Sequence, residues 1–397
     1  MTKDTSSAAP LTTDYSIVIH NPDRERYVEG SGLVRMDNGD LVAVVPIVPR
    51  RDWSIERRVT QSLTHILRSN DGGITWQPVS QLPYYSACPW VYQAKLYLFV
   101  NKGGTEYRND DLLLLCSDDS GTTWSEPTTL FKGHFWNCHT GMVIREQRIY
   151  WAVDDLVFGT KRGPKVVSGD LSGDPMEPTA WRMSNTVPFP GMTETMLSPQ
   201  FAGLPSQYLE PNVIDVNGRL RVLATVKPAR QTTASLCAVL DLNDDGEKLD
   251  LKFVQYSPMP GGQLKFCVIW DEVSRMFWAT ANLVVDSQEV YDWWETDNTR
   301  NQQIGAHKRR GGDDRRFLML FYGLDGLNWF QAGCVAQAGK LGQSFMYAKP
   351  VVDGDDLAII SRSSVNAPDH HDADHATFHR VRNFRRLALK LYPDTEE

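Results

Sequence analysis

Several side chains that can transfer protons stand beside apolar, strand-like segments of this sequence. Glu210 begins an apolar run that leads to an Asn-Gly pair, His139 directly precedes another apolar run, and Asp154 ends a third. A carboxylate at the start of a buried strand needs a partner, because burying an unpaired charge is strongly unfavourable. These three residues are therefore candidates for a functional site. A histidine packed among aromatic residues is an equally good interpretation of His139.

A tyrosine and further polar residues extend this set. Tyr347 lies in a strand-like segment that leads to an Asp-Gly pair. A phenol, with a pKa near 10, attacks poorly unless a neighbouring carboxylate takes its proton. Gln263 and Lys265 stand two residues apart ahead of a predicted strand, which places them on one face of extended chain.

Two copies of one eight-residue pattern indicate the elements that would position these groups. Residues 69–76 and 117–124 both read Ser-x-Asp-x-Gly-x-Thr-Trp, and shorter versions occur at 244–246 and 325–329. The Asp side chain can accept hydrogen bonds from backbone N–H groups two residues on, and the Gly adopts a positive φ without steric cost. Turns repeated at this period predict a β-propeller, whose blades are four-stranded sheets of roughly 40–50 residues.

The eight-residue pattern resembles the Asp-box of the sialidase superfamily, and the resemblance extends over most of the chain. The segments that contain Glu210 and Tyr347 each precede a hairpin turn, as do the family's corresponding strands. The family's Arg-Ile-Pro motif is absent, and the position of its first arginine falls near Glu29. The resemblance implies an all-β fold, a six-bladed β-propeller of the sialidase type.

The resemblance also implies roles for individual residues. In sialidases a tyrosine is the nucleophile and a glutamate takes its proton, and these roles fall on Tyr347 and Glu210; such enzymes are exceptions to the two-carboxylate rule. The acid would be Asp52 or His139. Either Arg315 or Arg316 matches the family's third arginine. The substrate-binding candidates are Arg51, Asp154, Lys227, Arg230, Gln263, Lys265, Arg316, Arg362 and His375.

The function favoured by this set is that of a retaining exo-glycoside hydrolase acting on an acidic or otherwise unusual sugar. A polysaccharide lyase that cleaves uronate-containing glycans by β-elimination is the alternative. In such lyases a Tyr and a His, here Tyr347 and His139, exchange the protons while basic residues neutralise the uronate. A non-catalytic carbohydrate-binding propeller is the third interpretation.

Length, charge and composition set the remaining expectations. Residues 1–15 are polar and predict a disordered arm, and residues 16–397 predict a single propeller domain. The net charge of −8 argues against nucleic acid as a partner, and no apolar stretch approaches the roughly 18 residues of a membrane span. The expected partner is a glycan. The sequence as given predicts a cytoplasmic protein, or a secreted or periplasmic one if a signal peptide was removed, and leaves the oligomeric state open.

Histidine and cysteine, the residues that most often bind zinc, show no clear metal-binding pattern in the sequence. Four histidines fall between residues 370 and 379, but their spacing matches no zinc signature, and substrate contact or a polar loop is favoured. The six cysteines are scattered without a Cys-x-x-Cys pair, which favours reduced core thiols. We expect no metal and no cofactor.

Overall fold

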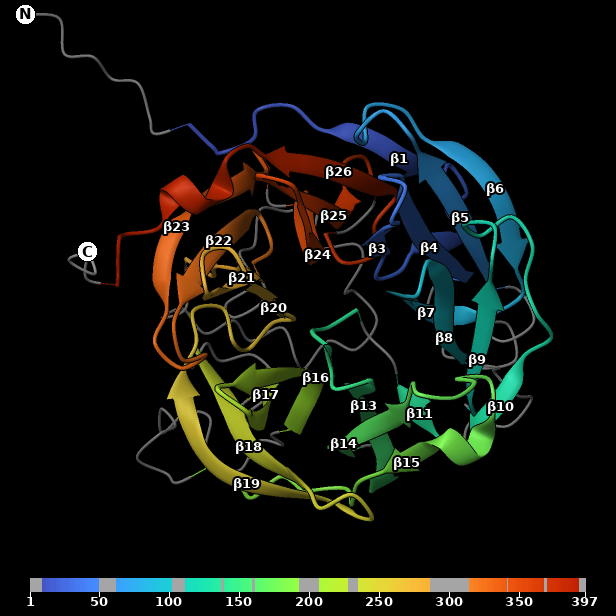
Figure 1. Cartoon of the computed structure of the whole chain (residues 1–397). Helices are drawn as coiled ribbons and strands as arrows, with labels where there is room; N and C mark the ends of the chain where they lie inside the picture. Colours follow the sequence, from blue (N-terminus) through green and yellow to red (C-terminus); the bar gives the residue numbers. More distant parts are fainter. Residues whose placement is uncertain are drawn as a thin grey trace, which may run out of the picture.

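Strands make up nearly all the regular structure of this chain. The computed structural model describes residues 9–49, 62–101, 111–136, 139–158, 161–192, 207–227, 235–285, 314–340, 342–367 and 370–392. Within those residues the strands form six sheets of four or five strands. Figure 1 shows the sheets arranged around a common centre. The all-β, six-bladed propeller predicted from the repeated turns is confirmed.

The first three blades follow one another along the first half of the chain. In each, antiparallel strands are arranged in chain order outward from the centre, and in blades 1 and 3 two short strands share the innermost position. Blade 1 contains β2 (Arg26–Val28), β3 (Gly32–Arg35), β4 (Leu41–Pro49), β5 (Leu63–Ser69) and β6 (Gln77–Leu82); blade 2 contains β7 (Tyr85–Tyr92), β8 (Lys95–Asn101), β9 (Leu112–Ser117) and β10 (Thr128–Phe131); blade 3 contains β11 (Phe135–Trp136), β12 (Val143–Arg145), β13 (Arg148–Phe158), β14 (Lys161–Asp170) and β15 (Trp181–Met183).

The second half of the chain forms the other three blades. Two short 3-10 helices, η1 (Pro178–Ala180) and η5 (Phe384–Leu387), flank strands. No helix within the described ranges is long and apolar enough to cross a lipid bilayer. Blade 4 contains β16 (Gln207–Val216), β17 (Arg219–Lys227), β18 (Leu236–Asp244) and β19 (Leu249–Pro258); blade 5 contains β20 (Cys267–Asp271), β21 (Met276–Asn282), β22 (Phe317–Gly323) and β23 (Phe330–Gln337); blade 6 contains β24 (Ser344–Asp353), β25 (Asp356–Ser364), β26 (His375–Val381) and β1 (Ser16–His20).

The ring closes where the two ends of the chain pair. β1 is antiparallel to β26, with Ser16 opposite Phe378 and His20 opposite His375. Figure 1 shows β1, in blue, beside β26, in red. The N-terminal strand is therefore the outermost strand of the last blade, and opening the ring at this point requires breaking that pairing.

The segment ahead of β1 differs from the expected disordered arm. Residues 1–8 lie outside the described part, but from Leu11 the chain is held against blade 5. The N–H groups of Leu11 and Thr12 donate to the carbonyls of Cys334 and Val335 over 2.7 and 3.1 Å. The Leu11 side chain packs onto the core between blades 5 and 6. One apolar residue within a polar stretch thus anchors this segment.

Aromatic side chains fill the space between blades 2 and 3. Phe99 of β8 stacks on Trp151 of β13, with 4.6 Å between ring centroids and 7° between planes. Trp181 of β15 packs edge-on against Phe99 at 5.4 Å. All three rings are buried. Large flat side chains contribute large apolar areas to this interface, which accounts for part of the high aromatic content of the sequence.

The two repeated turns share one hydrogen-bond pattern. The Ser69 hydroxyl donates to Asp71 over 2.7 Å, and the backbone N–H groups of Ile74 and Thr75 donate to the same carboxylate over 3.0 Å. Residues 117–124 repeat these contacts. The carboxylate thus reaches N–H groups three and four residues ahead, rather than the two expected. Each turn connects the two outermost strands of its blade.

The innermost strand of every blade is irregular at a corresponding position, which we call the axial level. In blades 1 and 3 the strand is split into two pieces, in blades 2, 4 and 6 its register shifts, and in blade 5 it begins just beyond this level. The residue at this level always lies seven residues before the first residue of the following hairpin turn, as Glu210 lies before Asn217. The six positions are Gly30, Ser86, His139, Glu210, Lys265 and Tyr347.

Candidate functional site

Three of these six residues hold a strained backbone conformation. Ser86, Glu210 and Tyr347 have φ values of +51°, +52° and +50°. Each lies where the pairing of the inner strand is shifted. Left-handed conformations of this kind cost non-glycine residues about 1–2 kcal/mol and persist only where the surroundings enforce them, commonly at functional sites. The strain therefore draws attention to this level of the ring.

The other inner-strand residues show that side chains of different blades come close together at the axis of the ring. A Cβ placed on Gly30 of blade 1 would lie 3.4 Å from the His139 ring and 3.6 Å from the Tyr347 ring. The Lys265 ammonium of blade 5 donates to the carbonyl of Ala348 in blade 6 over 2.7 Å. Residues from blades 1, 3, 5 and 6 thus meet at one place.

Two buried arginines lie against the ring of Tyr347. The guanidinium carbons of Arg315 and Arg362 are 5.2 and 5.0 Å from the centroid of its ring, within the range of cation–π attraction. Arg315 is 3% exposed and Arg362 is 2% exposed, whereas Tyr347 is only partly buried. Two guanidinium groups at this point can hold an anionic substrate and stabilise negative charge that develops on the phenolic oxygen.

Asp154 connects Glu210 to Arg162. The N–H of Glu210 donates to both Asp154 oxygens over 3.1 and 3.2 Å, and Arg162 Nη1 donates to Oδ2 over 3.2 Å. Burial raises the pKa of Asp154 to about 7, against the opposing effect of the Arg162 charge. The Asp154 carboxyl is therefore partly protonated near neutral pH and can both give and take a proton.

His139 is a buried, neutral histidine. Its Nε2 donates to the carbonyl of Gly30 over 2.5 Å, and since a carbonyl only accepts, Nε2 carries the proton and Nδ1 the lone pair. Burial lowers the pKa of His139 to about 3, and the positive charges of Lys265 and Lys349 act in the same direction. At neutral pH this ring therefore cannot give up a proton as an imidazolium.

The two polar candidates just before β20 of blade 5 differ in whether they already have a hydrogen-bond partner. Lys265 is occupied by the Ala348 carbonyl. Gln263 is 2% exposed, and neither its amide nitrogen nor its amide oxygen has a hydrogen-bond partner within the described residues. A buried amide without partners is costly, and this makes Gln263 the strongest candidate here for a hydrogen bond to a bound molecule.

The other candidates from the sequence are dispersed. Arg316 is paired with Asp314 over 2.6 Å and lies against Phe317, while His375 lies beside His20 in the outer part of blade 6. Lys227 is the last residue of β17 and is partly buried. Arg51, Asp52 and Arg230 lie outside the described residues.

Two charged residues at this level are not predicted as members of the site. The resemblance leaves Arg315 as an alternative to Arg316, and it is Arg315 that lies against Tyr347. Arg162, which pairs with Asp154 and covers the Trp136 ring at 4.8 Å, is not among the candidates from the sequence. The seven-residue spacing before each hairpin turn is visible in the sequence and would have selected all six axial positions at once.

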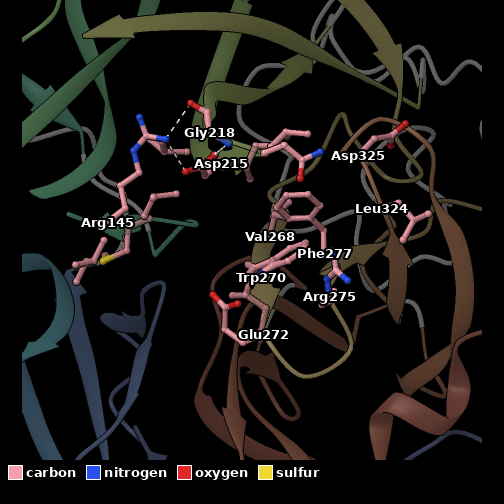
Figure 2. Close-up of a pocket in the computed structure, with 18 of the residues that line it drawn as sticks. Arg145, Asp215, Gly218, Val268, Trp270, Glu272, Arg275, Phe277, Leu324 and Asp325 are labelled. Atoms are coloured by element: carbon pink, nitrogen blue, oxygen red, sulfur yellow. Dashed lines mark hydrogen bonds and ion pairs between the residues drawn. The ribbon is translucent and has the colours of Figure 1, made fainter. Parts of the chain in front are cut away.

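A cavity of about 750 Å³ opens on the opposite side of the ring. Figure 2 shows its wall, in which Arg145 is paired with Asp215 and with the carbonyl of Gly218 over 2.7 and 2.9 Å. These residues, with Glu272, lie at the hairpin-turn ends of the inner strands. The axial residues that precede the turns by seven positions are not among those that line this cavity, but Lys349, two residues beyond Tyr347, does line it.

Comparisons with known proteins agree on the fold. No protein-family profile and no curated protein matches the sequence. Among solved structures, the chain is similar to an α-L-arabinanase from Penicillium chrysogenum in complex with arabinobiose (14% identity, 94% of this chain and 99% of that one, TM-score 0.54). It is also similar to a GH93 α-L-arabinofuranosidase from Fusarium graminearum (11%, 94% and 98%, 0.56) and to a sialidase from Streptococcus pneumoniae (8%, 93% and 70%, 0.57). At these identities the likeness shows a shared six-bladed propeller fold.

Proposed function

We propose that this protein is a carbohydrate-active enzyme, a retaining exo-glycoside hydrolase of the sialidase-like type that acts on an acidic or otherwise unusual sugar. The observation that carries the proposal is that the guanidinium groups of Arg315 and Arg362 both lie against the ring of Tyr347. A tyrosine suits an anomeric carbon crowded by negative charge, because a carboxylate nucleophile would be repelled there. The solved structures with a similar fold include enzymes named as glycosidases and sialidases.

In the proposed first step, the phenolic oxygen of Tyr347 attacks the anomeric carbon and the bond to the leaving oxygen breaks. Glu210 accepts the phenolic proton, and an acid protonates the leaving oxygen. Two carboxyl groups are candidates for this acid: Asp52, by the sequence resemblance, and Asp154, because its raised pKa keeps part of it protonated near pH 7. Water then releases the sugar from Tyr347, which restores the free enzyme.

A glycan panel tests this proposal with two readouts on each reaction. New reducing ends report cleavage by either route, and absorbance in the ultraviolet reports the unsaturated uronate that only a lyase produces. We expect reducing ends without absorbance from the wild type, and loss of turnover in Tyr347→Phe and Glu210→Gln. Tyr256→Phe is the matched control, since that hydroxyl donates to Gly191 in the outer part of blade 4. Turnover retained in Tyr347→Phe would overturn the assignment of the nucleophile.

The lyase alternative is favoured by a different contact. The His371 ring stands edge-on to Tyr347, with 6.4 Å between centroids, and its Nδ1 lies 2.9 Å from a carboxylate oxygen of Asp372. A tyrosine and a histidine beside Arg362 could exchange the protons of a β-elimination. His371 would then take the place of His139, whose ring is buried against Gly30. Absorbance that appears with turnover and is lost in His371→Ala would select this alternative.

A non-catalytic carbohydrate-binding propeller is the remaining possibility. It predicts no turnover on any glycan, and binding that survives both Tyr347→Phe and Glu210→Gln. Binding by the wild type that is abolished by Arg362→Ala, without any turnover, would place the sugar at this site and reject the enzymatic proposal.

A further inference from the structure

The closure of the ring carries a cluster of potential metal ligands. His20 of β1 lies directly opposite His375 of β26, and their rings stack with 4.3 Å between centroids and 16° between planes. Asp374 precedes His375, and one ligand atom from each of the three residues lies within 4.8 Å of the other two. The cluster therefore joins the first strand of the propeller to the last.

One member of this cluster has an unsatisfied ring nitrogen. His375 is 5% exposed, and its Nδ1 has no hydrogen-bond partner within the described residues. That nitrogen lies 2.9 Å from Oδ1 of Asp374, but without the geometry of a hydrogen bond. A buried donor or acceptor left unpaired is costly, so the arrangement favours a bound cation that both atoms can share.

The carboxylate of Asp374 is held in place before any ion binds. The N–H groups of Val365 and Asn366 each donate to one of its oxygens over 2.9 Å. The N–H of Asn21, the residue after His20, donates to the backbone carbonyl of Asp374 over 2.8 Å. The ligand is thus pre-oriented by β1 and by the end of β25, which lowers the entropy lost when a metal binds.

We propose that His20, Asp374 and His375 bind a zinc ion that fastens the closure of the ring. Two imidazoles and one carboxylate are a set that zinc accepts, with bonds of about 2.0–2.1 Å. Ligand atoms around a tetrahedral ion then lie about 3.4 Å apart, so the 2.9 Å between Asp374 and His375 needs to open by about half an ångström. The exposed His20 ring must also rotate out of its stack on His375, because a zinc ion lies in the plane of each imidazole that binds it. His20 is exposed, which leaves the fourth position open to water.

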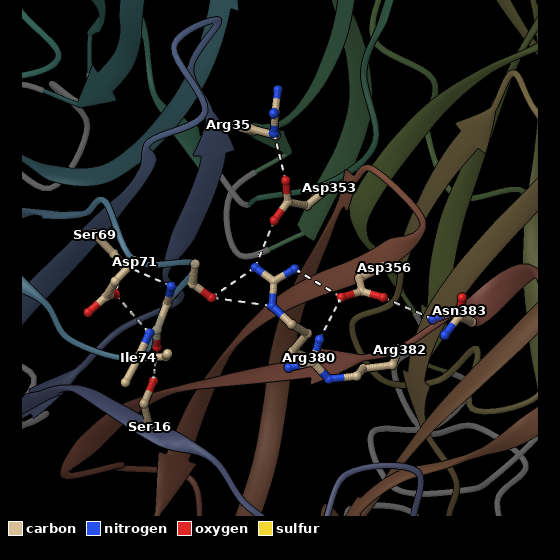
Figure 3. A network of polar contacts seen from close by, with 12 residues as sticks. Ser16, Arg35, Ser69, Asp71, Ile74, Asp353, Asp356, Arg380, Arg382 and Asn383 are labelled. Carbon is tan, nitrogen blue, oxygen red and sulfur yellow. Dashed lines mark hydrogen bonds and ion pairs between the residues drawn. The ribbon is translucent and has the colours of Figure 1, made fainter.

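The proposed zinc site lies at the start of β26, and ion pairs already hold the other end of this strand. Figure 3 shows Arg380, near the end of β26, between Asp353 and Asp356, with Arg35 of blade 1 on the far side of Asp353. Arg380 also donates to the carbonyl of Gly72 in the first repeated turn. Ion pairs therefore join blades 6 and 1 at this end, whereas near the opposite end of β26 the described contacts are backbone hydrogen bonds, from Val28 to Ala373 and from Asn21 to Asp374.

Metal analysis of the full-length protein tests the site. After incubation with zinc chloride and dialysis, we expect the wild type to retain about one zinc per chain, and His20→Ala and Asp374→Asn to retain less than about a fifth of that. His65→Ala is the matched control: this histidine lies on β5, partly buried and beside Gln81. Equal zinc contents in the wild type and His20→Ala would overturn the proposal.

Thermal unfolding tests the role in closure. Zinc at a hundredfold excess over its dissociation constant should raise the Tm of the wild type and of His65→Ala by about 5 °C and leave that of His20→Ala unchanged. Because His20 is exposed, its replacement should leave the metal-free protein folded, and the Tm without zinc verifies this. Zinc that binds to the wild type without raising its Tm would reject the closure role.

Discussion

The backbone N–H of Glu210 donates hydrogen bonds to both carboxylate oxygens of Asp154, over 3.1 and 3.2 Å. This contact joins the inner strand of blade 4 to the second strand of blade 3 at the level of the axial site. Protonating or replacing the Asp154 carboxylate should therefore change both the position of Glu210 and the charge next to it. The pKa of Asp154, raised to about 7 by burial, makes the effect depend on pH.

We predict that Asp154→Asn alters how stability changes with pH. Between the ordinary value of 3.8 and about 7, the folded protein keeps a proton that the unfolded chain has released, so the contribution of this group to stability is present at low pH and is lost as pH rises towards 7. Asparagine carries no charge at any pH. Urea unfolding at pH 5 and 8 should therefore show the wild type losing stability relative to the variant as pH rises.

Asp170→Asn is the control for this measurement. Hydrogen bonds from Ser172 lower the pKa of Asp170, so its contribution is present above pH 3.8 and is lost only as pH falls below that. The difference between the wild type and this variant should stay constant from pH 5 to 8. If Asp154→Asn behaves in the same way, Asp154 does not titrate near neutrality.

The strained residues at the axis yield a second prediction. Glu210 has a φ of +52°, which glycine adopts freely and alanine does not. Both Glu210→Gly and Glu210→Ala remove the carboxylate, but only Glu210→Gly relieves the strain. We expect Glu210→Gly to be more stable than Glu210→Ala by about 1 kcal/mol in urea unfolding, while both lose activity.

Val213, on the same strand, provides the comparison. It is buried and has no positive φ, so Val213→Gly should be less stable than Val213→Ala by about 0.5–1 kcal/mol. The order of stability at position 210 is thus opposite to that at 213. The same order at both positions would mean that the backbone at Glu210 is not strained in solution.

The architecture could be predicted from the sequence because it depends on local chemistry. The Ser69 to Trp76 turn makes its hydrogen bonds within eight residues, and its recurrence in residues 117–124 was sufficient to indicate blades. The axial level was only partly predicted. The sequence predicts Glu210 and Tyr347, but which of two adjacent arginines lies against Tyr347 depends on a strand register that local sequence does not determine.

Contacts between residues far apart in the chain could not be predicted from the sequence for a related reason. His139 and Gly30 are 109 residues apart, and the contact that fixes the histidine's tautomer arises only when blades 1 and 3 meet at the axis. The pKa values of buried groups likewise depend on burial by distant segments. A sequence shows that a histidine is present, but whether it is neutral and packed or charged and exposed follows from the closed ring.

A third prediction concerns stability in mild acid. His379 is fully buried between Tyr15 and Phe345, and burial lowers its pKa to about 3. The unfolded chain binds a proton at this residue below about pH 6.5 and the folded protein does not, so stability is lost as pH falls from 6.5 towards 3. This loss amounts to about 1.4 kcal/mol per pH unit for one such group.

His379→Gln should lessen this loss, because glutamine does not titrate and can still bond to Thr377, whose hydroxyl lies 3.0 Å from Nε2. Unfolding in urea at pH 4.5, 5.5 and 6.5 measures the slope for each protein. His65→Gln provides the comparison: burial also lowers the pKa of His65, but this ring is only partly buried, so its replacement should lessen the slope by a smaller amount. A wild-type slope that is unaffected by His379→Gln would show that this histidine does not carry the effect.

The first repeated turn yields the last prediction. Gly73 has a φ of +90°, and a Cβ at that position would lie 2.2 Å from the ring of Phe378 on β26. Gly73→Ala must therefore both strain the turn and displace an aromatic ring at the closure of the propeller. We expect it to destabilise the protein by about 3 kcal/mol or more.

Gly246→Ala separates these two effects, because Gly246 has a similar φ of +94° but no atom within 4 Å of the added Cβ. That variant should cost only the strain, about 1–2 kcal/mol. The difference between the two variants in urea unfolding measures how tightly the turn packs on Phe378. Equal losses at both positions would mean that blade 1 and blade 6 are not packed against each other at this turn, and that the closure is looser than the contacts between Gly73 and Phe378 require.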